Sequence, residues 1–169
     1  MSAVCESERL RLRAAQPADA AFMLKLLNQP SWIRGIGDRG VRTLDDAARY
    51  IEARMLAPLR ALGFGMYVVE LKAGGTAVGL CGLVKRDTLP HPDLGFALLD
   101  EHAGQGYAAE AASAVLRHAR EALRLPRLLA ITTPANERSG RLLLKQGFRL
   151  DDGGHISATG ERLNLYVFP

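Results

Sequence analysis

The sequence predicts an α+β fold in one domain, with a mixed, mainly antiparallel sheet. Two observations carry this prediction. Segments that alternate polar and apolar side chains are interspersed with segments of helical periodicity, in the order βααβββαβαββ. The chain has 169 residues, of which 48% are hydrophobic and 24% charged, and neither a repeat nor a linker divides it. This size and composition are typical of a single soluble globular domain, here residues 1–169.

The N-terminal half begins with a strand and a helix. Residues 8–13 alternate polar and apolar side chains, as a half-buried strand does. Pro17 suits the first turn of a helix, which the stop signal at 28–30 should end. Residues 32–42 contain three glycines and are expected to form a loop.

A second helix and a hairpin follow. Thr43 and Asp46 resemble a capping box, with aspartate in place of the usual glutamate, and predict a helix that ends near Met55. The runs 66–71 and 77–84 are separated by a Gly-Gly turn, which predicts a β-hairpin.

The C-terminal half alternates strands and helices. Residues 93–99 have the composition of a strand, and residues 106–123 carry a clear apolar stripe at helical spacing. The remaining predicted elements are a strand at 128–133, a helix at 136–146, and strands at 148–151 and 162–168.

The most informative segment is the glycine-bearing turn between strand 93–99 and helix 106–123. The first amides of a helix have no partner inside the helix, and the helix dipole adds positive charge there. Gly104 and Gly106 would let the backbone come close to an anion. The sequence therefore predicts a phosphate-binding site on residues 103–108.

A dinucleotide site is one interpretation of this turn, because Gly104-x-Gly106-x-x-Ala109 fits a known fingerprint. That fingerprint opens a βαβ unit and needs an acidic residue about 20 positions later to bind the ribose. Strand 128–133 ends without a carboxylate, and too few residues remain for a second nucleotide-binding half. The context therefore argues against a dinucleotide.

Charge and composition narrow the choice of partner. The net charge of +4 and the pI of about 9.4 favour anionic ligands. A nucleic-acid partner is the competing interpretation, but the arginines are scattered and aromatic residues make up only 6% of the chain. No apolar run approaches the length of a membrane span, and no signal-peptide pattern is present, so we expect a cytoplasmic protein without a membrane partner.

The two cysteines suggest neither a disulfide framework nor a metal site. Cys5 and Cys81 are far apart and have no clustered histidines, so no metal is expected. Cys81 lies in a β-like run and is most simply a small buried hydrophobe. The alternative, an acyl-carrying nucleophile, lacks a base nearby in the sequence.

The second informative segment runs from Asn136 to Phe148. Asn136 is a good N-cap, and Gly147 suits the left-handed residue that follows a helix. These local roles do not explain Ser139, whose hydroxyl would lie in the first turn beside strand 128–133.

With both segments considered, the chain resembles the GNAT acetyltransferase superfamily, specifically its Rim-type branch, named for ribosomal-protein N-terminal acetyltransferases. The resemblance covers nearly the whole chain. It includes residues 9–13, residues 35–43, the turn Gly104-x-Gly106-x-Ala108, and Asn136-x-x-Ser139 through Gly147-Phe148. It implies splayed central strands and helices on both faces of the sheet.

The resemblance also implies acetyl-CoA as the acetyl donor. The residues whose backbone would bind its pyrophosphate are Ala103, Gly104, Gln105, Gly106, Tyr107 and Ala108. The family usually carries Gln or Arg where this chain has Ala103, so a side-chain contact is missing there. The pantetheine arm would enter between the splayed strands and pair with the stretch Phe96, Ala97 and Leu98. Asn136 and Ser139 would line the opposite wall.

The catalytic roles implied are a base, an acid and an amide donor. The Leu98 amide would donate to the thioester carbonyl as its oxygen gains charge. Asp93 stands where Rim-type relatives often carry a glutamate and would act as general base, with a water relay; the alternative is a solvated carboxylate at a strand start. Many members use a tyrosine acid where this chain has Leu143, which shifts the role to Ser139; the alternative is a plain helix-start serine.

The acceptor would be an amine on a small molecule or a protein N-terminus. Its site would draw on Trp32, Arg34, Arg39 and the 152–160 turn, with Trp32 either a lid or a packing residue. His91 and His102 lie near the site in sequence and are most simply surface residues. A non-catalytic acyl-CoA-binding module is the second functional hypothesis, and either a monomer or a homodimer is compatible with the sequence.

Overall fold

The computed structural model describes residues 2–169, which form one eight-stranded sheet in the order β1-β2-β3-β4-β5-β6-β8-β7. The strands are β1 (Cys5–Glu6), β2 (Leu10–Arg13), β3 (Met66–Leu71), β4 (Ala77–Val84), β5 (Asp93–Leu98), β6 (Leu128–Thr132), β7 (Arg149–Ile156) and β8 (Arg162–Phe168). Every neighbouring pair is antiparallel except β5 and β6, which are parallel. The predicted mixed, mainly antiparallel sheet is confirmed.

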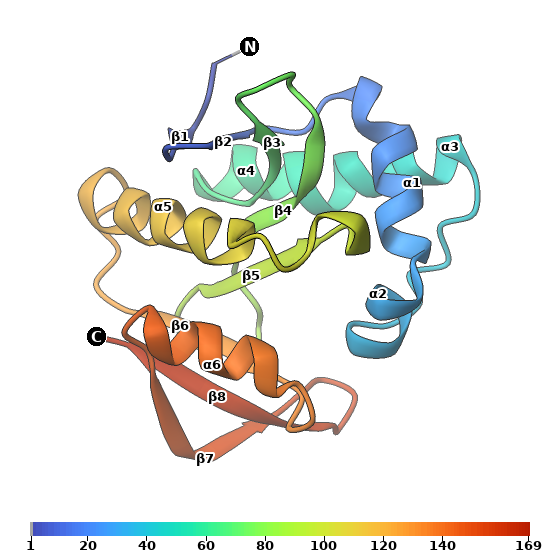
Figure 1. The fold of residues 1–169 in the computed structure, drawn as a ribbon. Helices are drawn as coiled ribbons and strands as arrows, with labels where there is room; N and C mark the ends of the chain where they lie inside the picture. Colours follow the sequence, from blue (N-terminus) through green and yellow to red (C-terminus); the bar gives the residue numbers. More distant parts are fainter. Residues whose placement is uncertain (1) are drawn as a thin grey trace.

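The parallel pair β5–β6 is joined at one position only. Asp93 pairs with Leu129, whose amide donates to the Pro92 carbonyl at 2.9 Å. Beyond this point the two strands separate, so the predicted splay of the central strands is confirmed. Figure 1 shows the two parts of the sheet, with β1–β5 above and β6–β8 below.

Helices cover both faces of the sheet, as predicted. They are α1 (Ala20–Asn28), α2 (Pro30–Gly35), α3 (Leu44–Tyr50), the π-helical segment η2 (Ile51–Leu56), α4 (Ala57–Leu62), α5 (Tyr107–Glu121) and α6 (Glu137–Lys145), with short 3-10 turns η1 (Pro17–Asp19) and η3 (Asp100–His102). In Figure 1, α5 crosses in front of β4 and β5, while the helical run that ends at α4 passes behind β4.

The core has two hydrophobic clusters, one on each face. Adjacent residues of β3 point to opposite faces because side chains alternate along a strand: Tyr67 packs with the α5 and α6 side, and Val68 with the α1, α3 and η2 side. Burial on both faces explains why β4 is an almost continuous apolar run. Cys81 of β4 is completely buried, which supports its interpretation as a small core residue.

Two predicted boundaries in the N-terminal half were wrong. The first helix ends at Asn28, as the stop signal at 28–30 predicts, but Pro30 then begins α2, so residues 32–35 are helical rather than part of the predicted loop. Proline is well placed at the first helical position because its missing amide has no partner there in any case. The second predicted helix continues past Met55 through η2 and α4 to Leu62.

Both edges of the sheet also differ from the prediction. The short strand β1 was not predicted, since two residues give no readable alternation. β7 extends to Ile156 instead of ending at 151, because a register shift between Asp151 and His155 absorbs the Gly-Gly pair that reads as a turn. No helix within residues 2–169 has both the length and the apolar composition needed to cross a membrane.

Candidate active site

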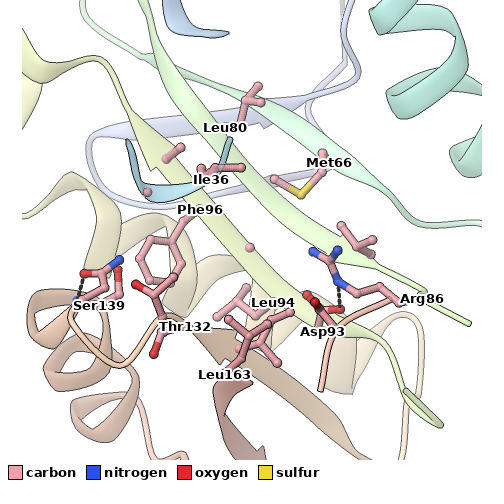
Figure 2. Close-up of a pocket in the computed structure, with 18 of the residues that line it drawn as sticks. Ile36, Met66, Leu80, Arg86, Asp93, Leu94, Phe96, Thr132, Ser139 and Leu163 are labelled. Carbon is pink, nitrogen blue, oxygen red and sulfur yellow. Dashed lines mark hydrogen bonds and ion pairs between the residues drawn. The ribbon is translucent and has the colours of Figure 1, made fainter. Parts of the chain in front are cut away.

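A cavity of about 690 Å³ opens where β5 and β6 separate. One wall comes from α2, the loop after it, and η2; a second comes from β5 and β6; a third comes from the start of α6 and the β7–β8 hairpin. Figure 2 shows Asp93 and Arg86 on one side of the cavity and Ser139, Thr132 and Phe96 on the other. The sheet therefore supplies polar groups at two separate points around one space.

Asp93 lies at the start of β5 with a side chain only 2% exposed. Its Oδ2 accepts a 2.8 Å hydrogen bond from Nε of Arg86. Burial raises the pKa of Asp93, while the charges of Arg86 and His155 act in the opposite direction and do not cancel it. The alternative of a solvated carboxylate is wrong. Sequence reasoning missed Arg86, because nothing in the loop after β4 showed that its guanidinium would return to the strand start.

Asn136 and Ser139 both line the cavity from the N-terminal end of α6. Oδ1 of Asn136 accepts from the Ser139 amide at 3.1 Å, so the predicted N-cap is confirmed. Leu143, one helical turn further on, is 1% exposed and also lines the cavity. The only hydroxyl that this face of α6 brings to the cavity is that of Ser139, within residues 137–145.

The exposed edge of β5 has the geometry of an unpaired strand. The amide of Leu99 donates to the Val78 carbonyl at 2.8 Å, which fixes the odd-numbered residues of β5 as those that bond to β4. The amides of Phe96 and Leu98 therefore face the gap toward β6. Phe96 and Ala97 line the cavity, whereas Leu98 lies just beyond its lining.

The Leu98 carbonyl already has a partner that sequence reasoning missed. Nε2 of Gln29 donates to it at 2.8 Å, and Oε1 of Gln29 accepts from the Asp100 amide at 3.1 Å. Gln29 had been interpreted only as part of a helix stop. Its side chain links the α1–α2 junction to the end of β5. It does not bond to the Leu98 amide, which faces the gap.

The turn before α5 has the backbone that its glycines predict. Gly104 and Gly106 have φ values of +82° and +83°, and Gly106 is the N-cap of α5. Side-chain-bearing residues rarely adopt this conformation, so glycine is required at both positions. Residues 103–106 are exposed, and none of residues 103–108 lines the cavity. The turn and the cavity are thus two separate sites connected by the β5 edge.

The N-terminal turn of α5 is held by the β1–β2 turn. Glu110 accepts from the Arg9 amide at 2.9 Å, from Nε of Arg9 at 2.8 Å, and from the Ser7 hydroxyl. The Arg9 guanidinium lies over the Tyr107 ring at 4.5 Å. A cation therefore lies beside the glycine turn. Sequence reasoning missed these contacts, because the partners of Glu110 are about one hundred positions away.

The predicted acceptor residues divide into two groups. Trp32 and Arg39 line the cavity, and Arg34 does not. Trp32 is 6% exposed and packs in the α1–α3 cluster, which favours the packing interpretation over a mobile lid. The 155–161 segment contributes to the wall, where Nε2 of His155 lies 3.2 Å from Oγ1 of Thr88. His91 and His102 are not part of the lining.

Two polar atoms in the cavity wall are buried without a hydrogen-bond partner within residues 2–169: Nε1 of Trp32 and Oγ1 of Thr132. Leaving such a group unpaired costs about 1–3 kcal/mol. Both atoms are therefore candidate contacts for a bound molecule, and the sequence did not single out Thr132.

Residues 9–149 match the family model described as acetyltransferase (GNAT) domain. The chain belongs to this family. The match contains the β5 strand, the glycine turn and the whole of α6, which are the segments that build the gap and its surroundings. The fold and the family thus agree with the GNAT resemblance seen in the sequence.

Similar proteins support this GNAT assignment. An uncharacterised N-acetyltransferase of Bacillus subtilis, YoaA, is 27% identical over 151 residues, which cover 88% of this chain and 84% of the relative. An acetyltransferase structure from Agrobacterium tumefaciens is 28% identical, with a TM-score of 0.83 and coverage of 100% and 96% of the two chains. The ribosomal L7/L12 α-N-protein acetyltransferase RimL, solved with coenzyme A, has the same fold at 18% identity, with a TM-score of 0.82 and coverage of 98% and 97%.

Two features of this chain bear on the kind of ligand that the site could bind. The glycine turn offers amides at a helix start, and the β5 edge offers unpaired backbone groups. Both features suit a ligand with a phosphate at one end and an extended amide-containing arm. Within residues 2–169, no cluster of histidine, cysteine or carboxylate side chains is arranged to hold a metal ion.

Proposed function

We propose that this protein is an N-acetyltransferase that moves the acetyl group of acetyl-CoA directly to a primary amine, on a small molecule or a protein N-terminus. The observation that carries the proposal is the unpaired β5 edge, which opens into a cavity containing Asp93 and Ser139. The whole chain, residues 1–169, would act as one catalytic domain. We expect a cytoplasmic monomer or homodimer without a nucleic-acid or membrane partner.

The glycine turn and the β5 edge would bind the donor. The amides of residues 103–108 would hold its pyrophosphate, and Phe96 to Leu98 would pair with its pantetheine arm, with Asn136 on the opposite side. When bound, the donor supplies an acetyl thioester. The Leu98 amide would then donate to the carbonyl oxygen as that oxygen gains negative charge.

Asp93 is the proposed base. A free amine is largely protonated near neutral pH and must lose a proton before it can attack. After the ammonium has released one proton to solvent, the neutral amine nitrogen bonds to the carbonyl carbon and the carbon–sulfur bond breaks. The second proton that the nitrogen must lose passes through a water relay to Asp93. A carboxylate whose pKa is raised by burial is a better proton acceptor than an ordinary surface aspartate.

Ser139 is the proposed donor to the departing thiolate. Leu143 has no group that can donate, whereas the Ser139 hydroxyl, one turn earlier on the same wall, would donate a hydrogen bond to the thiolate while keeping its own proton. Direct transfer needs no protein nucleophile. Cys81 is unsuited to that role because it is fully buried and burial raises the pKa of its thiol.

Release of free coenzyme A thiol from acetyl-CoA, measured with a panel of amines and N-terminal peptides, tests the proposal. We expect amine-dependent release that Asp93→Asn reduces strongly. Tight binding of acetyl-CoA with no release on any amine would reject catalysis.

A non-catalytic acyl-CoA-binding module is the second candidate function. The observation that favours it is the aliphatic side chain of Leu143, buried in the cavity wall at the position where the family resemblance implies a tyrosine acid. The same measurement separates the two candidates, because a binding module would retain affinity without turnover.

A further inference from the structure

Two arginines line the acceptor side of the cavity without an acidic partner. Arg39 follows α2, and Arg54 lies in η2; both side chains are exposed, and neither forms an ion pair within residues 2–169. The third arginine of the lining, Arg86, is bonded to Asp93. The α2–η2 wall therefore carries two free positive charges toward the cavity.

This positive wall includes a buried donor. Trp32 lines the same wall, and its Nε1 is buried without a partner among residues 2–169. Trp32 and Met55, the neighbour of Arg54, pack in one hydrophobic cluster, so the two segments of the wall are joined. An indole N–H only donates, which means that the missing partner must be an acceptor atom.

The backbone also singles out this wall. Arg54 lies in a π-helical segment of six residues, Ile51–Leu56, inserted between α3 and α4. Such segments are rare in proteins, and those that occur are often found at functional sites. They shift side chains out of α-helical register.

The opposite side of the cavity has negative groups. Asp87 follows β4 and Glu161 precedes β8, and both line the cavity without an ion-pair partner in the part of the chain that the structure describes. Figure 1 shows α2 above the β7–β8 turn, and residues of both segments line the cavity between them. The cavity thus has positive side chains on the side of α2 and η2. It has negative side chains on the side of Asp87, Asp93 and Glu161.

The free arginines are not explained by the donor's phosphates. The expected pyrophosphate site is the turn 103–108, none of whose residues lines this cavity. Arg9, which lies over Tyr107, is the cation nearest to that turn in the contacts described above. Arg39 and Arg54 are therefore available to a second anionic group.

We propose that the acceptor is an amine that also carries an anionic group, a carboxylate or a phosphate. Arg39, Arg54 and Nε1 of Trp32 bind the anion, and the amine lies toward Asp93. This inference rests on the proposed acetyltransferase function and names the substrate class of that site.

Matched pairs of acceptors test the inference and distinguish the two anions. The pairs are a dipeptide with a free or an amidated C-terminus, and phosphoethanolamine or ethanolamine. For each compound, coenzyme A release gives kcat/KM, and calorimetry on the coenzyme A-loaded protein gives acceptor affinity. We expect the anionic member of at least one pair to be favoured by about tenfold or more in both quantities.

Variants then show which residues produce the preference for the anionic acceptor. Arg39→Ala and Arg54→Ala should each remove most of it, mainly by raising KM, and Trp32→Phe should weaken it by removing the donor. Arg60→Ala is the matched control, because Arg60 lies on the same helical run outside the cavity lining and pairs with Glu52 on the surface. It should keep the full preference.

The outcomes separate this inference from the function on which it rests. Equal use of neutral and anionic acceptors, with normal coenzyme A release, overturns the inference and leaves the acetyltransferase intact. Arginine-dependent binding of the anionic member without any release supports the binding site and rejects the proposed catalysis. Equal binding of both members without release overturns both.

Discussion

Nε of Arg86 donates a 2.8 Å hydrogen bond to Oδ2 of Asp93, a carboxylate that is buried at the one point where β5 and β6 pair. The carboxylate is thus fixed in orientation by a guanidinium that is itself partly exposed. An oriented, desolvated carboxylate beside the proposed reaction space is a strong candidate for the base.

Asp93→Asn is expected to lower kcat by about 100-fold or more, because a general base contributes about 10²–10⁴-fold. The amide has the same shape and can still accept from Arg86, so a loss of activity reports proton transfer. Steady-state kinetics with saturating acetyl-CoA measure it, and Asp152→Asn, at an exposed position of β7, is the control. Equal activity of the two variants would remove Asp93 from the mechanism.

Arg86→Gln is expected to move the acidic limb of the pH–rate profile to higher pH. Burial already raises the pKa of Asp93, and the charge of Arg86 opposes that rise. Without the positive charge of Arg86, Asp93 holds its proton to a higher pH. The active, ionised form of Asp93 is therefore reached only at a higher pH. An unchanged limb would show that the limb belongs to another group.

Asp93→Asn should keep or gain thermal stability although it loses activity. Because the pKa of Asp93 is higher in the folded than in the unfolded chain, the folded state binds more protons between these two values, and stability falls as pH rises through that window. The ionised carboxylate is therefore a cost at neutral pH, which the neutral amide avoids. Compared with the parent chain, we expect Asp93→Asn to have an equal or higher Tm at about pH 7. Its Tm should also change less between about pH 4 and about pH 7, the range that begins where aspartate normally titrates. A sharp fall in Tm would contradict this.

Gly106→Ala should destabilise the fold and weaken donor binding together. Alanine at a positive φ costs roughly 1 kcal/mol, or about 2–4 °C in Tm for a domain of this size. The added methyl would also lie 3.3 Å from Nη2 of Arg9. Gly63→Ala is the matched control, since Gly63 has a φ of +82° at the end of α4 with open space around it. It should lose similar stability while retaining coenzyme A affinity measured by calorimetry.

Glu110→Gln should loosen the N-terminal end of α5 at neutral pH, with a smaller effect in acid. Burial raises the pKa of Glu110, but its hydrogen bonds with Ser7 and Arg9 outweigh burial and lower it overall. In the parent chain this contribution is present above the unfolded pKa and is lost as pH falls through the lowered folded value. The variant should melt about 2–4 °C lower at pH 7, a difference that shrinks in acid. Glu52→Gln, which breaks an exposed pair, should have little effect.

Local signals in the sequence predicted the elements that depend on local chemistry. The Thr43–Asp46 capping box is present, with the Asp46 amide donating to Oγ1 of Thr43 at 3.0 Å. Gly104 and Gly106 have the positive φ values that their turn requires. Such features depend on residues a few positions apart, and that is why they can be read from one chain.

Features that join distant segments could not be predicted in this way. Glu110 binds Arg9 across the molecule, and Gln29 bonds to the end of β5, about seventy positions later. The stop signal at 28–30 predicted the end of α1 correctly, but it did not show that Pro30 also begins the short helix α2. Whether a second helix follows such a stop is decided by packing, which local sequence patterns do not show.

The single β5–β6 pairing divides the sheet into two leaves that share one backbone contact. A ligand arm that paired with the free β5 edge would act as a missing ninth strand and close this seam. The protein would then be stiffer when loaded than when empty, and the amides of Phe96 and Leu98 would exchange with solvent most slowly in the loaded state. Catalytic turnover would accordingly proceed as a cycle of completing and reopening a β-sheet.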